Sequence, residues 1–256
     1  MSRKIRLIAR LDVKDDFLVK GIQYEGLRKL GDPHDFARRY YEQGIDEILY
    51  LDTVASLYER NNLGNILERT TADVFIPITA GGGLRSAEDV GAVLKAGADK
   101  AAVNTAALRR PELITEVARA FGSQCMVLSI QAKRRDPARP AAGWEAYYDN
   151  GREHSGKDVL EWAKQAVALG AGEILLSSVD REGFQKGMDQ ELIAAVAGLV
   201  DVPVIAAGGA ASAGDIAAAA KGGADAVAVG SILHYGKTDV PALKDEVRAL
   251  GVEVRR

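Results

Sequence analysis

The sequence predicts a single α/β domain folded as a (β/α)8 TIM barrel with a twofold repeat of half-barrels. Three observations lead to this prediction: the length, eight apolar runs that alternate with helical patterns, and an internal repeat. The chain has 256 residues, of which 47% are hydrophobic, and single barrels commonly have about 250 residues. We therefore expect one domain over residues 1–256, with half-barrels at about 1–122 and 123–256.

The apolar runs are short and lie between segments with helical spacing. Strands that alternate with helices are typical of a parallel sheet, and eight strands close a barrel. The alternation alone leaves an open, doubly wound sheet as the alternative. We predict strands at residues 5–11, 47–51, 75–79, 100–103, 126–130, 173–177, 202–206 and 226–229. We predict helices at residues 33–43, 86–96, 111–121, 156–169 and 189–199.

The internal repeat favours the barrel. A shift of 126 positions places Pro77 on Pro203 and Ser86 on Ser212. Over residues 76–105, 14 of the 30 positions are identical to the shifted sequence without a gap. Agreement of this extent indicates two fused halves, each of four β/α units.

In each half a strand runs into a glycine cluster, and the next strand ends in small polar residues. Because glycine lacks a Cβ, its backbone N–H is open to an anion, and the start of the following helix favours negative charge. One such turn is often only a tight turn, but two related by the repeat predict two phosphates on opposite sides of the mouth. The predicted phosphate-binding residues are Gly82, Gly83, Asn104 and Thr105 in the first half, and Gly208, Gly209, Gly230 and Ser231 in the second.

Composition argues against several classes of partner. The chain has 33 Lys and Arg against 36 Asp and Glu, so we expect neither nucleic acid nor an anionic membrane as a partner. There is no run of 18 apolar residues and only one cysteine, so we expect a cytoplasmic protein without a membrane span or an internal disulfide. The three histidines lack metal-ligand spacing, and we predict no metal and no cofactor.

A series of motifs covers essentially the whole chain. They lie at residues 11–14, 18–21, 31–33, 46–52, 81–83, 103–106, 121–125, 161–164, 172–176 and 180–181. In this order they resemble the cyclase subunit of imidazole glycerol phosphate synthase, the HisF family. The resemblance implies a barrel that takes ammonia from a partner glutaminase (HisH-like) subunit and leads it through its interior. The ammonia is then joined to a bis-phosphorylated ribosyl-aminoimidazole carboxamide, and the products are imidazole glycerol phosphate and an aminoimidazole carboxamide ribotide.

The resemblance assigns catalytic positions to Asp12 and Gln131. Asp12 matches the family's essential carboxylate, a group suited to general acid–base catalysis. The family has a second aspartate on the fifth strand, but here Gln131 can only orient a ligand by hydrogen bonds, since it transfers no proton near neutral pH. Arg10 stands where the family usually has a small cysteine. In the phosphate-side loop that contains Gly183, Phe184 replaces a threonine, and we expect it to crowd the second phosphate site.

Four charged residues match the ring that gates the ammonia channel at the bottom of the family's barrel. Inward-facing charges are costly unless they pair, and two of each sign can do so. A salt-bridge plug with a purely structural role is the alternative. The ring residues are Arg6, Glu47, Lys100 and Glu173, and the further residues expected at the mouth are Lys20, Asp52, Ser177 and Asp180.

Several functions remain open. Gln131, Arg10 and Phe184 favour a HisF-like paralogue that delivers ammonia for amidation of a nucleotide sugar in surface polysaccharide synthesis. The alternative is a genuine cyclase of histidine biosynthesis. A non-enzymatic alternative is a subunit that only docks to a glutaminase and activates it, but Asp12 and both glycine clusters argue against it. The charged ring argues against a barrel isomerase that acts on the preceding histidine intermediate.

Overall fold

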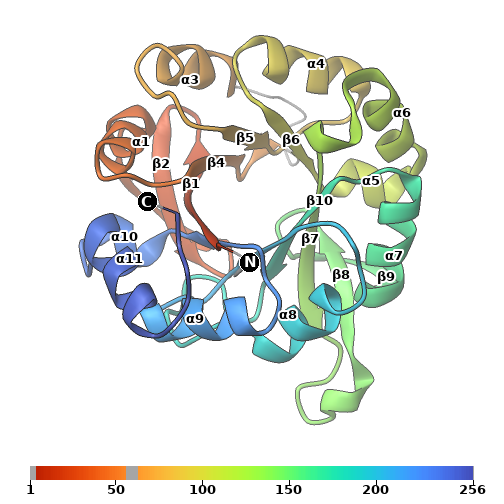
Figure 1. The fold of residues 1–256 in the computed structure, drawn as a ribbon. Coiled ribbons are helices and arrows are strands. Elements are labelled where there is room, and N and C mark those ends of the chain that lie inside the picture. The colour runs from red at the N-terminus through yellow and green to blue at the C-terminus, as the bar shows by residue number, and fades with distance from the viewer. Residues whose placement is uncertain (1–3, 56–62, 256) are drawn as a thin grey trace.

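The computed structural model describes residues 4–55 and 63–255, and within them eight parallel strands form a closed barrel (Figure 1). Each strand pairs in parallel with the next, and the last pairs with β1. The barrel strands are β1 (Arg6–Lys14), β4 (Glu47–Asp52), β5 (Ile78–Gly81), β6 (Lys100–Val103), β7 (Met126–Arg134), β10 (Glu173–Ser178), β11 (Val204–Ala207) and β12 (Ala226–Val229). The predicted (β/α)8 barrel is thus confirmed.

Helices surround the strands (Figure 1). Their apolar faces pack on the outer side of the barrel, where Tyr40 and Trp162 are among the largest fully buried side chains. The helices are α1 (Pro33–Glu42), α3 (Leu63–Thr70), α4 (Ala87–Lys95), α5 (Thr105–Arg109), α6 (Glu112–Phe121), α7 (Val159–Leu169), α8 (Gln190–Ala197), α9 (Ala213–Lys221), α10 (Ser231–His234) and α11 (Val240–Ala249). The described part of the chain also contains two 3₁₀ turns, η1 (Ser123–Cys125) and η2 (Pro140–Ala142).

Two barrel strands begin later than the apolar pattern predicts. β5 starts at Ile78 and β11 at Val204, each directly after a proline. Proline has no N–H to give to a strand ladder, but its carbonyl still accepts. The carbonyl of Pro77 accepts from the N–H of Ile48 at 3.0 Å, and that of Pro203 from Ile174 at 2.9 Å. Phe75, which the prediction placed in a strand, has 74% of its surface exposed.

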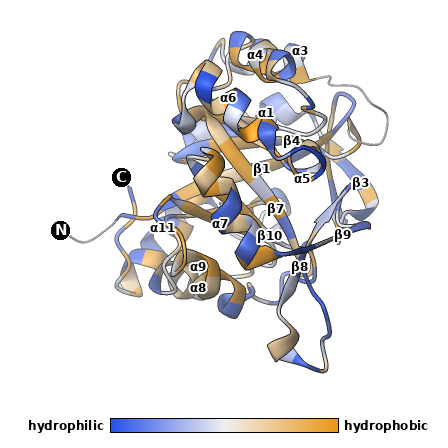
Figure 2. Ribbon diagram, turned by 90° about the vertical axis from the view of Figure 1, so that its right-hand side faces the viewer, coloured by the Kyte–Doolittle hydropathy of each residue, from blue (hydrophilic) through white to orange (hydrophobic). Residues whose placement is uncertain are grey.

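Antiparallel strands extend the barrel beyond its mouth. β2 (Phe17–Ile22) and β3 (Glu25–Gly31) form a hairpin on β1, while β8 (Trp144–Tyr148) and β9 (Glu153–Asp158) continue from β7. Figure 2 shows β3 and β9 at the same end of the barrel. The helix predicted from residue 156 begins only at Val159, because residues up to Asp158 belong to β9. Asp158 then caps α7 by accepting from the N–H groups of its first turn.

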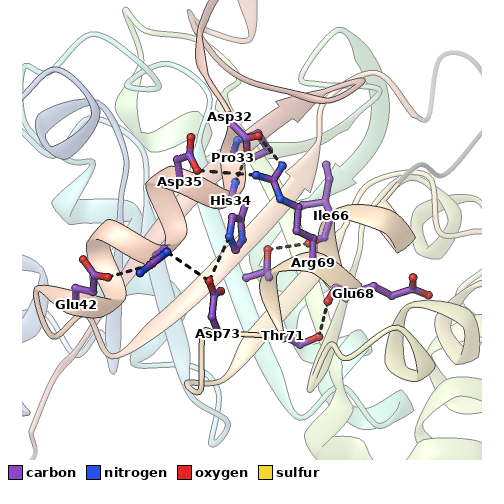
Figure 3. Close-up of polar contacts among 12 residues, drawn as sticks. Asp32, Pro33, His34, Asp35, Glu42, Ile66, Glu68, Arg69, Thr71 and Asp73 are labelled. Atoms are coloured by element: carbon purple, nitrogen blue, oxygen red, sulfur yellow. Dashed lines mark hydrogen bonds and ion pairs between the residues drawn. The ribbon is translucent and has the colours of Figure 1, made fainter.

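Polar contacts between α1 and α3 hold the connection that follows β3 (Figure 3). Asp32 caps α1 by accepting from the N–H of His34 at 2.8 Å, and its other oxygen accepts from Arg69 on α3 at 2.6 Å. The imidazole of His34 lies 3.4 Å from the carboxylate of Asp73. The strand hairpin is therefore anchored to two outer helices.

Side chains at alternate strand positions point into the barrel and form layers. Along β1 these are Arg6, Ile8, Arg10 and Asp12. Charged residues form the layer at the start of the strands, polar ones form the layer at the mouth, and apolar ones lie between. The buried apolar cluster comprises Ile8, Leu49, Ala102, Val127, Leu175, Ile205, Ala207, Ala226 and Ala228. An apolar interior thus separates two charged ends.

Candidate functional site

A cavity of about 280 Å³ opens at the carboxyl ends of the barrel strands. It reaches down to Ala102 of the apolar interior and up to arginines at its rim. Its lining comprises Arg10, Tyr24, Leu51, Asp52, Thr53, Gly82, Gly83, Leu84, Arg85, Ala102, Asn104, Thr105, Ala106, Arg109, Arg110, Ser129, Gln131, Asn150 and Ser177. All four residues predicted for the first phosphate site are among them.

The two glycine clusters share an unusual backbone. Gly82 and Gly83 have φ of 101° and 70°, and Gly208 and Gly209 have φ of 93° and 90°, a region that residues with a Cβ rarely adopt. A Cβ on Gly82 would lie 2.2 Å from the carbonyl oxygen of Asp52. The chain therefore requires glycine at this turn in both halves.

The residues that end the next strand are also alike in the two halves. Asn104 has φ −120° and ψ −84°, and Gly230 has φ −131° and ψ −81°. Each precedes a short helix. The structure brings each pair of predicted phosphate segments to one side of the mouth, as the repeat indicates; the division into half-barrels at residue 122 stays a prediction.

The second cluster is much more closed than the first. A space of about 20 Å³ lies against Gly208, Gly209, Gly230, Ser231 and Gly183, room for about one water molecule. Arg10, Lys20 and Glu182 also line this space, while Gly183 and Ser231 border a further open space beside the β2–β3 hairpin.

The expectation for Phe184 was wrong. Its ring is 39% exposed, faces Lys186 and does not line the small space. Glu182, two residues earlier in the same loop, points inward instead and binds Arg10 and Lys20.

Asp12 lies in a buried network of four charges. Its carboxylate accepts from Arg10 Nε at 2.8 Å and from Lys20 Nζ at 2.6 Å. Glu182 binds the same two cations, Arg10 Nη1 at 3.0 Å and Lys20 Nζ at 2.5 Å. We call these four residues the mouth network. The motif at residues 180–181 pointed to this loop, but no sequence signal identified the adjacent Glu182.

The mouth network holds both carboxylates in the charged form. Burial alone would raise the pKa of Asp12, but Arg10 and Lys20 outweigh it and lower this pKa to about 2. The same cations lower the pKa of Glu182. Tyr24, at the tip of the β2–β3 hairpin, lies over Arg10 with its ring centre 5.4 Å from the guanidinium carbon. A carboxylate with so low a pKa is a weak base near neutral pH.

Gln131 fixes the turn between β8 and β9. Its Oε1 accepts from the N–H of Gly151 at 2.8 Å, and the neighbouring Asn150 lines the cavity and donates to the carbonyl of Thr53. Asp12 and Gln131 both lie at the mouth on facing strands, but only Gln131 lines the larger cavity.

The same turn reaches the first glycine cluster. Asp149 accepts from Thr105 Oγ1 at 3.3 Å and from Arg109 at 3.2 Å. Asn104 donates to the carbonyl of Tyr147 at 3.2 Å. The contact of Asp149 with this cluster was not predicted, and neither were the rim arginines of the cavity, Arg85, Arg109 and Arg110.

The other predicted mouth residues have different settings. Lys20 belongs to the mouth network, and Ser177 is buried in the cavity wall. Asp52 lines the cavity, but its Oδ1 accepts from the N–H groups of the two residues after Thr53, at 3.0 and 2.9 Å. Asp180 accepts from the N–H of Arg134 at 2.8 Å and does not line the cavity.

A second network of charges closes the opposite end of the barrel. Arg6 donates to Glu47 at 2.7 Å and to Glu173 at 2.5 Å. Lys100 lies 2.7 Å from Glu173 and 3.5 Å from Glu47. These four residues form the bottom ring, as the resemblance predicted for their positions.

His234 connects the mouth to the outer helices. Its Nε2 lies 2.9 Å from the carbonyl oxygen of Arg10 and its Nδ1 lies 2.7 Å from the hydroxyl of Tyr40. Because a carbonyl can only accept, Nε2 carries the proton and Nδ1 accepts from Tyr40. Burial lowers the pKa of His234 to about 4, so the ring is neutral at neutral pH.

Within the described residues, no group of three or more His, Cys, Asp or Glu side chains could hold a metal ion. None of the helices in the same part of the chain is long and apolar enough to cross a membrane.

A closed barrel with a ligand-sized cavity at the carboxyl ends of its strands has the architecture of barrel enzymes.

Comparison with known proteins identifies the family. Residues 6–239 match the model of a family described as histidine biosynthesis protein. The chain is 48% identical, over the whole of both proteins, to imidazole glycerol phosphate synthase subunit HisF of Mycobacteroides abscessus. It is 56% identical to the HisF subunit of Legionella pneumophila, over 80% of this chain and 95% of that protein. The chain therefore belongs to the HisF family.

Proposed function

We propose that this chain is the ammonia-using cyclase subunit of an imidazole glycerol phosphate synthase. The observation that carries the proposal is the connection of three parts in one barrel: a charged ring, an apolar interior and a cavity beside a glycine cluster. Relatives with this name align over the full length. They support the cyclase better than the amidation paralogue that we favoured from the sequence.

Ammonia would enter through the bottom ring from a glutaminase subunit. Lys100 is the most exposed member, with 20% of its side chain accessible, and its 3.5 Å distance to Glu47 is the longest in the ring. Movement of Lys100 would open the ring at low cost, because Arg6 still pairs with both carboxylates. The apolar layer beyond admits neutral ammonia more readily than ammonium, since burying an unpaired charge is costly.

The ligand would lie across the mouth with one phosphate at each glycine cluster. The first cluster borders the open cavity, whereas the second has space for about one water molecule. A Cβ on Gly183 would lie 2.2 Å from the carbonyl oxygen of Gly21 on the β2–β3 hairpin. The hairpin and the 180–184 loop are therefore in contact beside the second cluster, and a phosphate would approach it from the open space that Gly183 and Ser231 border.

Ammonia would meet the ligand where the cavity touches the apolar interior, near Ala102. Ser129, Gln131 and Ser177 line this part and can orient ammonia or a carbonyl group by hydrogen bonds. In the geometry observed, the low pKa of Asp12 makes it a poor proton acceptor. A negatively charged ligand group beside Asp12 would raise this pKa and make Asp12 a better base.

Amidation of a nucleotide sugar remains the second candidate, for a specific reason. Gln131 leaves the mouth without the second carboxylate that the family's cyclase uses, and Arg10 occupies the other carboxylate, Asp12. Attack of ammonia on an activated carbonyl needs orientation of the two reactants more than it needs a pair of acid–base groups. The rim arginines of the cavity suit a diphosphate as well as a monophosphate.

The test is reconstitution with the glutaminase subunit from the same organism. We expect a complex, faster glutamine hydrolysis, and glutamine-dependent consumption of the ribosyl bisphosphate. Ammonium salt should replace glutamine and partner in the same assay. Complex formation and stimulation without turnover of either ligand would support the docking subunit instead. No complex with any glutaminase subunit and no turnover with ammonium salt would refute the proposal.

A further inference from the structure

Arg10 has an unusual position for a charged residue. It points into the barrel from β1 and is only 2% exposed. It borders both the larger cavity and the small space at the second glycine cluster. Its carbonyl accepts from His234 at 2.9 Å, which holds this part of β1 against the outer helices.

Two of the three guanidinium nitrogens have partners. Nε donates to Asp12 and Nη1 donates to Glu182. Nη2 is buried, and none of the residues in the described part of the chain accepts a hydrogen bond from it. The hydroxyl of Tyr24 is close enough to favour the charged guanidinium, but it lies outside hydrogen-bonding geometry. A buried donor without an acceptor costs free energy.

The larger cavity is the side that a ligand can reach. Tyr24, which covers the guanidinium, lines this cavity, whereas Asp12 and Glu182 do not. Three more arginines lie at its rim, and the one carboxylate in its lining, Asp52, already accepts two backbone N–H groups. Each rim arginine lies within 4.0 Å of a carboxylate, that of Asp89, Asp149 or Glu116, so Nη2 of Arg10 is the donor through which this cavity favours a negatively charged ligand group.

We propose that Arg10 is a ligand-binding residue whose Nη2 donates to an anionic oxygen, of a phosphate or a carboxylate, on a ligand in the larger cavity. Asp12 and Glu182 hold the guanidinium plane so that little freedom is lost on binding. Arg10 would then favour ligands that carry an anionic group beside it. The proposal rests on the proposed function only in that an anionic ligand binds at this mouth.

The experiment uses inorganic phosphate and acetate as separate probes on the full chain. ¹H–¹⁵N spectra of the guanidinium groups and of the glycine amides are recorded during each titration. Arg10→Lys, which keeps the charge but lacks Nη2, assigns the Arg10 signal. Arg69→Lys on α3 is the matched control, because Arg69 pairs with Asp32 (Figure 3) and lines neither space at the mouth.

We expect phosphate, acetate or both to shift the Arg10 signal, and the anion that does so identifies the ligand group. Arg10→Lys should weaken binding of that anion about tenfold, the effect of one charge-assisted hydrogen bond, and Arg69→Lys should leave it unchanged. If Arg10→Lys does not fold, crystals of the wild-type protein soaked in phosphate give the distance from Nη2 to the anion.

The two proposals fail in different ways. Amide shifts at Gly82 and Gly208 with no response of Arg10 to either anion would overturn the role of Arg10 and leave the phosphate clusters in place. A shift of the Arg10 signal without any shift of the glycine amides would support ligand binding by Arg10 and count against phosphate binding at the glycine clusters.

Discussion

Two networks of four charges lie at opposite ends of the barrel, and β1 contributes to both. The bottom ring and the mouth network each contain two cations and two carboxylates. They differ in access to water: the Lys100 side chain is 20% exposed, whereas no side chain of the mouth network exceeds 5%. They also differ in hydrogen bonding. Both Nη atoms of Arg6 donate to carboxylates, whereas Nη2 of Arg10 has no hydrogen-bond acceptor among the described residues.

This difference in exposure and hydrogen bonding suits the two networks to the two roles proposed for them, a gate at the bottom and a binding surface at the mouth. A network with one partly solvated member can break and reform, because water replaces the lost contact. A fully buried network cannot open cheaply. It holds its four side chains in place, so that Nη2 of Arg10, the donor without an acceptor among the described residues, can bind a ligand.

The largest expected effect is on stability. Asp12→Asn leaves two buried cations with one carboxylate, so we expect the free energy of unfolding to fall by about 3 to 5 kcal/mol. Glu47→Gln creates the same imbalance in the bottom ring, but Lys100 can turn to water, and the expected loss is about 1 kcal/mol. Urea denaturation at pH 7 measures both. Equal losses would show that exposure of Lys100 does not distinguish the two networks.

The next effect is a pH dependence centred on His234. Its folded pKa of about 4 lies below the ordinary 6.5, so the folded state disfavours the protonated ring. The stability that this group contributes is complete above pH 6.5 and is lost as the pH falls through 4, a change of about 3 kcal/mol. The carboxylate of Asp12, with a pKa of about 2, contributes its own loss only between about pH 4 and 2.

His234→Gln tests this assignment. Glutamine keeps a donor for the carbonyl of Arg10 but does not titrate, so the loss of stability between pH 6.5 and 4 should shrink. Denaturation curves of the wild-type protein and the variant at pH 7, 5 and 4 measure this loss of stability. An unchanged slope in the variant would assign that pH dependence to other groups.

Much of the fold and part of the site could be predicted from the sequence. The strand–helix alternation and the repeat predicted the closed barrel, because parallel strands buried on both sides give short apolar runs. The inward positions of Arg6 and Asp12 followed from alternation along one strand. The glycine pairs were found because their backbone conformation requires glycine in both halves.

Other parts depend on contacts between distant segments. Glu182 meets Arg10 across 172 positions, and no local pattern records that approach. Tyr24 reaches the mouth at the tip of the β2–β3 hairpin, and no local pattern indicates that its ring covers Arg10. Phe184 was misplaced because Glu182, two positions earlier in the same loop, points inward in its place, and only the backbone decides which of the two faces the mouth.

A smaller effect concerns Gln131 and the missing carboxylate at the mouth. Gln131→Asp supplies an acid–base group but is too short to keep the hydrogen bond to Gly151. We expect ammonium-dependent turnover of the ribosyl bisphosphate to rise about tenfold and stability to fall by about 1 kcal/mol. Gln131→Asn, the control, loses the same bond without gaining a carboxylate and should gain no activity. If the wild-type protein already matches an authentic cyclase and Gln131→Asp changes nothing, the amidation candidate is wrong.

The smallest expected effect tests whether the glutaminase docks at the end that carries the bottom ring. Phe75 lies just before β5, at the start of the barrel strands, and is 74% exposed against the ring of Tyr41. An exposed aromatic side chain near the ring entrance is a candidate anchor for a partner. We expect Phe75→Ser to weaken glutaminase binding three- to tenfold, roughly the cost of losing one peripheral aromatic contact. Phe184→Ser at the mouth end removes an exposed aromatic of the same kind and should leave the affinity unchanged. Calorimetric titration of the glutaminase into the wild-type protein and the two variants measures these affinities. A loss of affinity in Phe184→Ser but not in Phe75→Ser would place the partner at the mouth and refute entry of ammonia through the ring.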